Sequence, residues 1–293
     1  MKSGFISIIG RPNVGKSTLL NSILGEKIAI TTAKPQTTRN IIRGIYTGED
    51  LQMIFIDTPG ITKPRNKLGE FMTGSALRTL NEVDIIMFIV DDYPEKGPGD
   101  RYITDILREI KTPKILLINK IDIMDPAKYK EIYDFYEKTG IFEEILGVSA
   151  KEGTNVRDII DHTGSILDEG PMYFPKDTVT DHPERFIVSE IIREKLLLYL
   201  EQEVPHGVAV EIESYEEKPD IIRIGAVIYC EKKSHKGIII GKEGRKLKGV
   251  GKSARQEIES LLGTKVFLEL WVKIKENWRD NDRDLSSFGY KVK

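Results

Sequence analysis

Short runs of consecutive apolar residues recur through the first 150 positions, and each run ends in a polar or glycine-rich turn. Amphipathic stretches with helical spacing, such as Arg101 to Ile110 and Pro126 to Lys138, separate several of them. Continuous apolar strands that alternate with helices predict an α/β fold whose mostly parallel sheet is covered on both faces. The predicted strands are Phe5 to Gly10, Leu51 to Asp57, Asp84 to Val90, Lys114 to Asn119 and Ile145 to Ser149.

The pattern changes near Gly170. Residues 171–184 contain three prolines and no periodicity, which is typical of a linker. Beyond them the pattern predicts a smaller α+β domain of order α-β-β-α-α-β, with helices at Phe186 to Glu201 and on both sides of Gly241 to Gly244, and strands at Gly207 to Ser214, Ile221 to Cys230 and Lys265 to Ile274. We therefore expect domains at 1–170 and 185–275, joined by the linker and followed by a tail at 276–293.

Composition excludes several classes of protein. The single cysteine, Cys230, excludes a disulfide framework and a cysteine-based zinc site. The longest strongly apolar run, Ile85 to Val90, is too short to cross a bilayer. A polar turn that starts at Gly10 interrupts the apolar N-terminus before a signal-peptide core can form. We therefore expect a cytoplasmic protein with two domains.

A phosphate-binding motif lies between the first predicted strand and a predicted helix. Glycines at its ends let successive backbone N–H groups point inward at a helix N-terminus, which is a favourable site for phosphate. We expect Lys16 to reach the β- and γ-phosphates and the Ser17 hydroxyl to bind Mg²⁺. The motif fits G-x-x-x-x-G-K-[ST] and consists of Gly10, Arg11, Pro12, Asn13, Val14, Gly15, Lys16 and Ser17, followed by Thr18.

Three further segments follow predicted strands and sharpen the prediction of the ligand. Asp57-Thr58-Pro59-Gly60 places an acid where it can hold the metal through water and a glycine amide near the γ-phosphate. In Asn119-Lys120-Ile121-Asp122, the carboxylate can accept from guanine N1–H and N2–H₂ while the asparagine meets N7. Ser149-Ala150-Lys151 can offer a backbone N–H to guanine O6. Together these segments favour GTP and GDP over adenine nucleotides.

With these motifs, the first 170 residues resemble a translation-factor-class GTPase domain with a P-loop. The resemblance implies that a threonine in Gln36-Thr37-Thr38-Arg39 approaches Mg²⁺ and the γ-phosphate. Spacing leaves Thr37 and Thr38 both open, and Thr38 is slightly favoured. We then expect Lys16, Thr38, Asp57 and Gly60 to be the catalytic groups, with Ser17, Thr38 and Asp57 around the metal.

Ile61 stands where Ras-like enzymes have a water-orienting glutamine, and an apolar side chain cannot orient water. The sequence therefore resembles the hydrophobic-substituted GTPases, and we expect slow intrinsic turnover. Asn13 occupies the position at which some of these relatives coordinate K⁺. An ordinary hydrogen bond within the phosphate loop accounts for Asn13 equally well.

A basic segment in the second half points to an anionic partner. Nine basic and only two acidic residues lie between Glu231 and Arg255, although the whole chain has a net charge of −2. A solvated helix face is the alternative explanation. Within this segment a Gly-x-x-Gly loop between two helices resembles a type II KH domain, which clamps single-stranded RNA beside an apolar groove. The expected RNA contacts are Lys236, Gly237, Ile238, Ile240, Gly241, Lys242, Glu243, Gly244, Arg245, Lys246 and Lys248.

The succession of GTPase and KH domains resembles the Era family of ribosome-assembly GTPases over nearly the whole chain. The segments Phe186 to Lys195 and Glu203 to His206 also resemble that family. The resemblance implies a monomeric switch that binds single-stranded RNA near the 3′ end of small-subunit ribosomal RNA and assists assembly of the small ribosomal subunit. It also implies peripheral association with the inner membrane, although the sequence has no evident amphipathic anchor. The alternative is a GTP-gated RNA-binding scaffold with little turnover.

Overall fold

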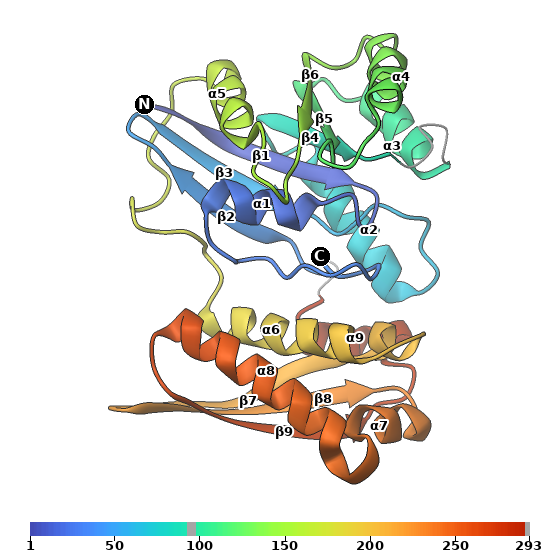
Figure 1. Ribbon diagram of the computed structural model, residues 1–293, viewed down its shortest axis with the longest axis vertical. Helices are drawn as coiled ribbons and strands as arrows, with labels where there is room; N and C mark the ends of the chain where they lie inside the picture. The colour runs from blue at the N-terminus through green and yellow to red at the C-terminus, as the bar shows by residue number, and fades with distance from the viewer. Residues whose placement is uncertain (93–97, 291–293) are drawn as a thin grey trace. The chain divides into compact units, whose positions relative to one another are not determined.

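A computed structural model describes residues 1–92 and 98–290. The chain divides into two compact units (Figure 1). The first comprises Met1–Pro64 with Met72–Asp181, and the second comprises Arg65–Phe71 with His182–Lys293. Among the described residues, no helix is both long and apolar enough to cross a membrane.

The first unit is built on a mixed sheet of order β2-β3-β1-β4-β5-β6. All neighbouring strands are parallel except β2, which runs antiparallel to β3 at the edge. The five predicted strands are confirmed, whereas β2 was not predicted. Gly44 interrupts the apolar pattern of this strand and has a weak propensity for strands. A Cβ at this position would lie only 2.7 Å from Leu20 Cδ1 of α1, so the packing of that helix requires glycine here. The strands are β1 (Lys2–Gly10), β2 (Ile42–Thr47), β3 (Leu51–Asp57), β4 (Ile85–Val90), β5 (Lys114–Asn119) and β6 (Glu144–Val148).

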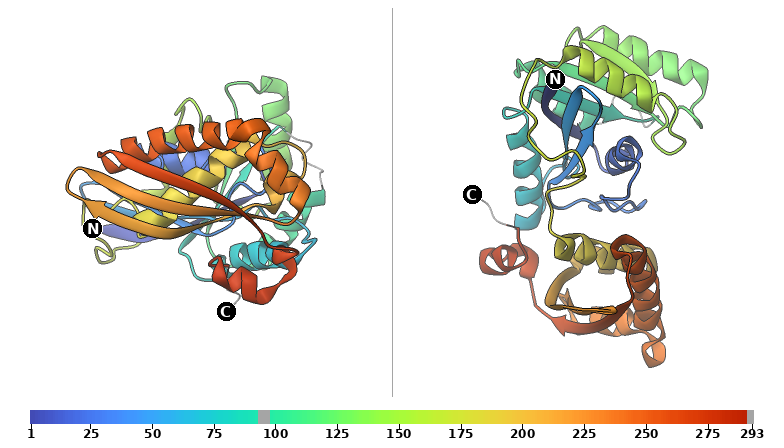
Figure 2. Two further views of the ribbon diagram at one scale, coloured as in Figure 1. Left: turned by 90° about the horizontal axis from the view of Figure 1, so that it is seen from below. Right: turned by 90° about the vertical axis from the view of Figure 1, so that its left-hand side faces the viewer.

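Helices cover both faces of this sheet, as the apolar strands predicted (Figure 2). Helices α1 and α5 pack against each other, and α1 also contacts β2 and β3. On the other face, apolar side chains of α2, α3 and α4 share one core with Ile9, Phe88 and Leu116 of the sheet. The helices are α1 (Lys16–Leu24), α2 (Lys67–Thr79), α3 (Pro98–Arg108), α4 (Pro126–Glu137) and α5 (Val156–Ile166).

The proline-rich segment after Gly170 is bonded to the first unit as far as Asp181. Gln52 Nε2 donates to Phe174 O at 2.8 Å, and the Ile45 amide donates to Val179 O at 2.8 Å. Arg43 also pairs with Asp181 at 2.6 Å. The segment therefore lies along the β2 edge of the sheet and supplies hydrogen-bond partners to it.

The second unit has the predicted order α-β-β-α-α-β. Its sheet has the order β7-β8-β9, with β7 antiparallel and β9 parallel to β8. Helices α6 and α8 lie on one face of this sheet (Figure 2), and Val250, Ala254 and Ile258 of α8 are buried in the shared core. The elements are α6 (Glu184–Tyr199), β7 (Ala209–Lys218), β8 (Ile221–Cys230), α7 (Lys233–Ile240), α8 (Arg245–Leu262) and β9 (Val266–Ile274).

Within the described residues, the polar tail has defined structure. It forms a turn at Trp278–Asp280 and a short helix, α9 (Asp282–Ser287). Trp278 is fully buried and donates from Nε1 to Gly207 O at 3.0 Å. Its ring also packs against Phe288 and Tyr290. Trp278, together with the buried Leu285 and Tyr290, thus anchors a tail whose sequence is mostly polar.

Candidate functional site

The phosphate loop curls between β1 and the first turn of α1. Gly15 has φ 104°, and a Cβ at this position would lie 2.1 Å from Asn119 Nδ2. Only glycine therefore permits both the left-handed backbone and the close approach of β5. Asn119 Nδ2 donates to Val14 O at 2.7 Å and holds the loop against the sheet. An open pocket lies over this loop, lined by Pro12, Asn13, Gly15, Lys16, Ser17, Thr18, Ile30, Thr31, Thr32, Gln36, Thr37, Thr38 and Gly60.

Lys16 is buried at the base of this pocket. Its ammonium donates to the carbonyl oxygens of Arg11 at 2.8 Å and Gly10 at 3.3 Å. Burial lowers the pKa of Lys16 to about 8, although the nearby Asp57 carboxylate raises it. A buried ammonium bonded to neutral carbonyl oxygens is well suited to exchange them for charged phosphate oxygens.

Ser17, Thr38 and Asp57 meet at the end of β3, as the sequence predicted. Ser17 Oγ lies 2.6 Å from Asp57 Oδ2 and 2.8 Å from Thr38 Oγ1. Asp57 is fully buried, and its Oδ1 has no hydrogen-bond partner among the described residues. Burial raises the pKa of Asp57 to about 6, against the effects of Lys16 and of the two hydroxyls. An unsatisfied carboxylate oxygen beside two hydroxyls is the oxygen-rich environment that Mg²⁺ prefers, so these residues fit the metal.

The two adjacent threonines point to different partners. Thr37 Oγ1 donates to Lys34 O at 2.6 Å and lies 2.7 Å from Thr32 Oγ1, so it stabilises its own loop. Thr38 Oγ1 instead lies within 3.4 Å of Asp57 Oδ2 and contacts Ser17. The geometry therefore distinguishes two residues that the spacing left open, and it favours Thr38 at the metal.

Asn119 links the phosphate loop to the segment after β6. Its Oδ1 accepts from the Ala150 amide at 3.0 Å, while its Nδ2 holds Val14 O. One of the backbone amides expected to face guanine O6 is thus engaged by Asn119 in this structure. Asp122 is exposed, and its charge contributes to raising the pKa of Lys151, after the larger effect of Glu152. Asp122 and Lys151 therefore flank the same region beside Asn119.

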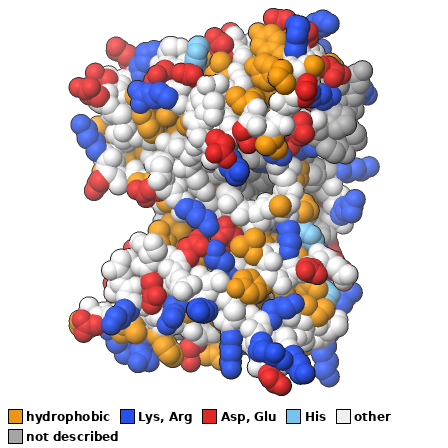
Figure 3. Space-filling model, in the orientation of Figure 1, with side chains coloured by type: hydrophobic (Ala, Val, Ile, Leu, Met, Phe, Trp, Pro, Cys, Tyr) orange, Lys and Arg blue, Asp and Glu red, His pale blue; other side chains and the backbone are white. Residues whose placement is uncertain are grey.

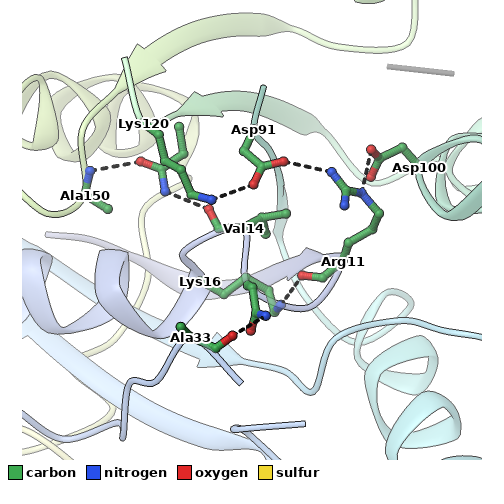
Figure 4. A network of polar contacts seen from close by, with 10 residues as sticks. Arg11, Val14, Lys16, Ala33, Asp91, Asp100, Lys120 and Ala150 are labelled. Carbon is green, nitrogen blue, oxygen red and sulfur yellow. Dashed lines mark hydrogen bonds and ion pairs between the residues drawn. The ribbon is translucent and has the colours of Figure 1, made fainter. Parts of the chain in front are cut away.

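An ion-pair network that the sequence analysis missed joins the phosphate loop to Lys120 (Figure 4). Asp91 pairs with both Arg11 and Lys120, and Arg11 also pairs with Asp100. Asp91 comes directly after the apolar run of β4. Ligands of α/β sheets bind at the carboxyl ends of the parallel strands, so the position of Asp91 directly after a predicted strand was the signal that could have identified it.

Asn13 and Ile61 also have defined environments. Asn13 has a left-handed φ of 66°, and its Nδ2 donates to Ala33 O at 2.8 Å. Ile61 is 1% exposed within the sheet core, and its amide donates to Gly10 O at 3.1 Å. Its side chain therefore packs in the protein interior, and it supplies no polar atom to the pocket.

In the second unit, the Gly-x-x-Gly loop connects α7 to α8. Gly241 has φ 72°, and a Cβ there would lie 2.7 Å from Lys246 Cβ, so glycine permits the tight passage between the helices. Lys242, Glu243 and Arg245 are exposed, and Gly244 opens α8. Of the other predicted RNA contacts, Ile238 is exposed on α7, whereas Ile240 packs against the core.

A groove runs beside this loop between α8 and β9. Two of the predicted RNA contacts, Gly244 and Lys248, line this groove, but most of its walls were not anticipated. The signal was the spacing along α8, where small or basic residues recur every three or four positions on one face. The residues that the analysis missed are Leu247, Gly251, Lys252 and Arg255 of α8, with Val266, Phe267, Leu268 and Leu270 of β9.

Charge is concentrated around this groove. Figure 3 shows Lys and Arg side chains gathered where α7 and α8 meet, with few acidic side chains among them. Lys248, Lys252 and Arg255 contribute three positive charges to the wall itself. An apolar floor with a cationic rim can bind bases and phosphates together.

Both units match known families. Residues 5–120 match the family described as 50S ribosome-binding GTPase, and residues 203–279 match the KH domain. GTPase Era of Alkaliphilus metalliredigens (strain QYMF) is 60% identical over 291 residues, which cover 99% of each protein. GTPase Era of Clostridioides difficile (strain 630) is 56% identical over 295 residues, covering 100% of this chain and 99% of the relative.

Two solved structures match the whole fold. Era in complex with MgGDPNP and nucleotides 1506–1542 of 16S ribosomal RNA has a TM-score of 0.96, 39% identity and full coverage of both chains. An Aquifex aeolicus Era variant bound to GDP·AlF₄⁻ has a TM-score of 0.95 and 38% identity, also with full coverage. The chain, a P-loop GTPase domain followed by a KH domain, therefore belongs to the Era family of GTPases.

Proposed function

We propose that this protein hydrolyses GTP to GDP and phosphate at the Ser17, Thr38 and Asp57 cluster and binds single-stranded RNA on its KH unit. The observation that carries the nucleotide proposal is the buried Asp57 carboxylate, which contacts two hydroxyls near the Lys16 ammonium and whose Oδ1 has no hydrogen-bond partner within the described part of the chain. When bound, Mg²⁺ would neutralise phosphate charge as it develops in the transition state. The related Era structure with MgGDPNP supports this assignment.

Each residue of the pocket has a distinct role in this proposal. Lys16 exchanges the Arg11 and Gly10 carbonyls for the β- and γ-phosphates. Ser17 and Thr38 supply hydroxyl oxygens to the metal, and Asp57 holds it through water. Gly60 lines the same pocket and offers its amide at the γ-phosphate. Residues Gly10 to Thr18 cradle the phosphate chain.

Guanine is proposed to bind between Asn119, Asp122 and the segment Ser149 to Lys151. Asn119 retains a second Nδ2–H for guanine N7 while it holds Val14. The exposed Asp122 carboxylate is proposed to accept from N1–H and N2–H₂. An adenine base presents a different arrangement of donors at these positions, so guanine is favoured.

The RNA proposal rests on the groove between α8 and β9 together with the Gly-x-x-Gly loop. Gly241 and Gly244 let a phosphate backbone pass close to the loop, and Lys248, Lys252 and Arg255 neutralise it. The apolar floor, which includes Leu247 and Leu270, would contact the bases. The related structure that holds nucleotides 1506–1542 of 16S ribosomal RNA supports the 3′ end of small-subunit RNA as the target.

The proposed role is a cytoplasmic, monomeric switch in assembly of the small ribosomal subunit. GTP and Mg²⁺ would order the Thr37–Thr38 loop, and hydrolysis would release it. If RNA affinity depends on the nucleotide, then RNA must change nucleotide affinity by the same factor. K⁺ bound at Asn13 is proposed as a stimulant of hydrolysis, with Asn13 Oδ1 as its ligand while Nδ2 donates to Ala33 O. Association with a membrane surface would be peripheral.

GTP turnover by the purified protein tests this function. We would measure it with and without RNA from the 3′ end of small-subunit ribosomal RNA, in potassium and in sodium. RNA stimulation of at least tenfold supports an enzyme coupled to its KH unit, and a potassium requirement supports the Asn13 site. A flat rate near zero in every condition, despite tight GTP binding, would instead identify a GTP-gated scaffold, an alternative that buried Ile61 favours.

A Lys16→Ala variant provides the control for contaminating hydrolases, because it removes the ammonium proposed to bind the phosphates. A Lys218→Ala variant removes one exposed positive charge of β7, at a residue that does not line the RNA groove. It is the control for RNA binding, because its RNA affinity should match that of the wild-type protein. Turnover that survives Lys16→Ala would overturn the proposed nucleotide site.

A further inference from the structure

We propose that Asp91 is a positioning residue for guanine nucleotides, which fixes the phosphate loop through Arg11 and the guanine-binding segment through Lys120. This inference rests on the nucleotide site proposed above. It assigns a role to a residue that touches neither the phosphates nor the base in that site. Asp91 would act through two basic partners, Arg11 and Lys120.

The two oxygens of Asp91 serve opposite ends of the site (Figure 4). Oδ1 accepts from Arg11 NH2 at 2.8 Å, and Oδ2 accepts from Lys120 Nζ at 2.7 Å. The Asp91 side chain is only 9% exposed, so these charge-assisted bonds are partly shielded from water. A single carboxylate thereby connects the loop after β1 with the loop after β5.

Arg11 is held from a second side by α3. Its Nε donates to Asp100 Oδ2 at 2.7 Å, and the Asp100 side chain is 2% exposed. Its aliphatic part passes Gly99, where a Cβ would lie 2.9 Å from Arg11 Cδ. The guanidinium is thus fixed in direction by two carboxylates and in position by the helix start. With two of its N–H groups held by carboxylates, Arg11 is proposed to leave phosphate binding to Lys16 and the loop amides.

This network acts on backbone that the nucleotide uses. The Arg11 carbonyl accepts from Lys16 Nζ at 2.8 Å, so the position of Arg11 influences the phosphate-binding lysine. Lys120 has a left-handed φ of 67° and lies next to Asn119, which itself holds Val14 O. Two connections therefore join the phosphate and base segments, one through Asn119 and one through Asp91. Ordering both segments before binding lowers the entropy that binding must overcome.

Asp91→Asn tests the proposal, because it keeps the shape of the side chain and removes its charge. We expect the KM for GTP and the Kd for GDP to rise about tenfold, the usual effect of weakening charge-assisted hydrogen bonds. We expect kcat at saturating GTP to stay within about twofold, since the bound nucleotide meets the same catalytic groups. Asp92→Asn, which removes the same charge from the exposed neighbouring residue, should leave both constants unchanged.

A double-mutant cycle separates positioning from a general loss of stability. If Asp91 acts through Arg11, Arg11→Gln should weaken GDP binding to a similar degree, and the double variant should lose less than the product of the two single losses. The inference would be overturned if the double variant lost GDP affinity by the product of the two single losses. An unchanged KM in Asp91→Asn, or a fall in kcat at constant KM, would also overturn it. If Asp91→Asn does not fold, Arg11→Gln with its KM-against-kcat readout carries the test alone.

The outcomes also separate this inference from the proposed site. Failure of the wild-type protein to bind GDP, or indifference of GDP binding to Lys16→Ala, would overturn the proposed site itself. Normal wild-type binding together with an unaffected Asp91→Asn variant would overturn only the role of Asp91.

Discussion

The Ser17 hydroxyl donates a 2.6 Å hydrogen bond to Asp57 Oδ2 and so joins the first turn of α1 to the end of β3. Both groups belong to regular secondary-structure elements. Thr38 contacts this pair from the segment between α1 and β2. A bound metal at this point would therefore connect one loop residue with a helix and a strand.

The two threonines should differ in their effects on hydrolysis. We expect Thr38→Ala to lower kcat by about tenfold or more, since it removes a metal-facing hydroxyl, and to leave GDP affinity within about twofold. Thr37→Ala is the matched control, because Thr37 bonds only within its own loop in the contacts described above. Single-turnover GTP hydrolysis provides the measurement, and a larger effect of Thr37→Ala would assign the metal to the other threonine.

Metal-dependent binding should weaken in mild acid. The pKa of Asp57 is raised to about 6 by burial, and a proton on the carboxyl competes with Mg²⁺. We expect the Mg²⁺-dependent slowing of GDP dissociation to diminish as pH falls through about 6, and Asp57→Asn should lack this pH step. An unchanged Mg²⁺ effect at pH 5 in the wild-type protein would contradict this prediction.

The same shift has a definite sign for stability without metal. The folded state favours protonated Asp57, since its pKa lies above the ordinary value of 3.8. The contribution of Asp57 to the free energy of unfolding is therefore complete below pH 3.8 and is lost as pH rises through about 6. Mg²⁺ should restore stability at neutral pH, which chemical denaturation with and without the metal would detect.

Changing the base-recognising carboxylate should change nucleotide specificity. In Asp122→Asn an amide faces guanine N1–H and N2–H₂, so GTP affinity should fall roughly a hundredfold. Xanthosine triphosphate should gain affinity, because its C2 carbonyl accepts from that amide. Competition against a labelled guanine nucleotide measures both effects. An equal loss of affinity for both nucleotides would show that Asp122 does not contact the base.

RNA binding should be sensitive to a charge placed in the loop. Gly244→Asp meets no atom within 4 Å, so it adds a carboxylate beside the phosphate path without a collision. We expect RNA affinity to fall at least tenfold while GTP affinity is retained. Gly241→Asp is a poorer test, because its Cβ would collide with Lys246.

Gly263→Asp is the matched control for this experiment. Gly263 ends the same helix, α8, has a similar φ of 65°, and likewise leaves open space for a Cβ. If both variants lose RNA affinity equally, the loss comes from a change in α8. The Gly-x-x-Gly loop would then not be the phosphate contact.

Most of the fold could be predicted because each central strand is buried on both faces and its sequence is continuously apolar. The edge strand β2 was missed, since Gly44 is dictated by Leu20 and Leu24 of a helix distant from it in sequence. The structure of the tail was not predicted either. It depends on buried side chains such as Trp278, whose partner Gly207 lies 71 residues away.

The site was predictable where its residues form a contiguous motif with fixed spacing. The phosphate loop and the three strand-end segments belong to this class. Asp91 and the β9 wall of the RNA groove do not, because their role depends on which segments pack side by side. The choice between Thr37 and Thr38 also required coordinates. The two residues fit the spacing of the motif equally well, but their side chains point to different partners.

The burial of Ile61 limits how this protein can evolve a faster hydrolytic step. A glutamine at this position would place an amide in a core that is fully packed with apolar side chains, at a cost of about 1–3 kcal/mol for unsatisfied polar groups. That loss is a large fraction of the stability of an ordinary domain. The packing of the sheet core therefore disfavours the single substitution that would supply a water-orienting side chain. Faster GTP hydrolysis would then depend on groups other than residue 61.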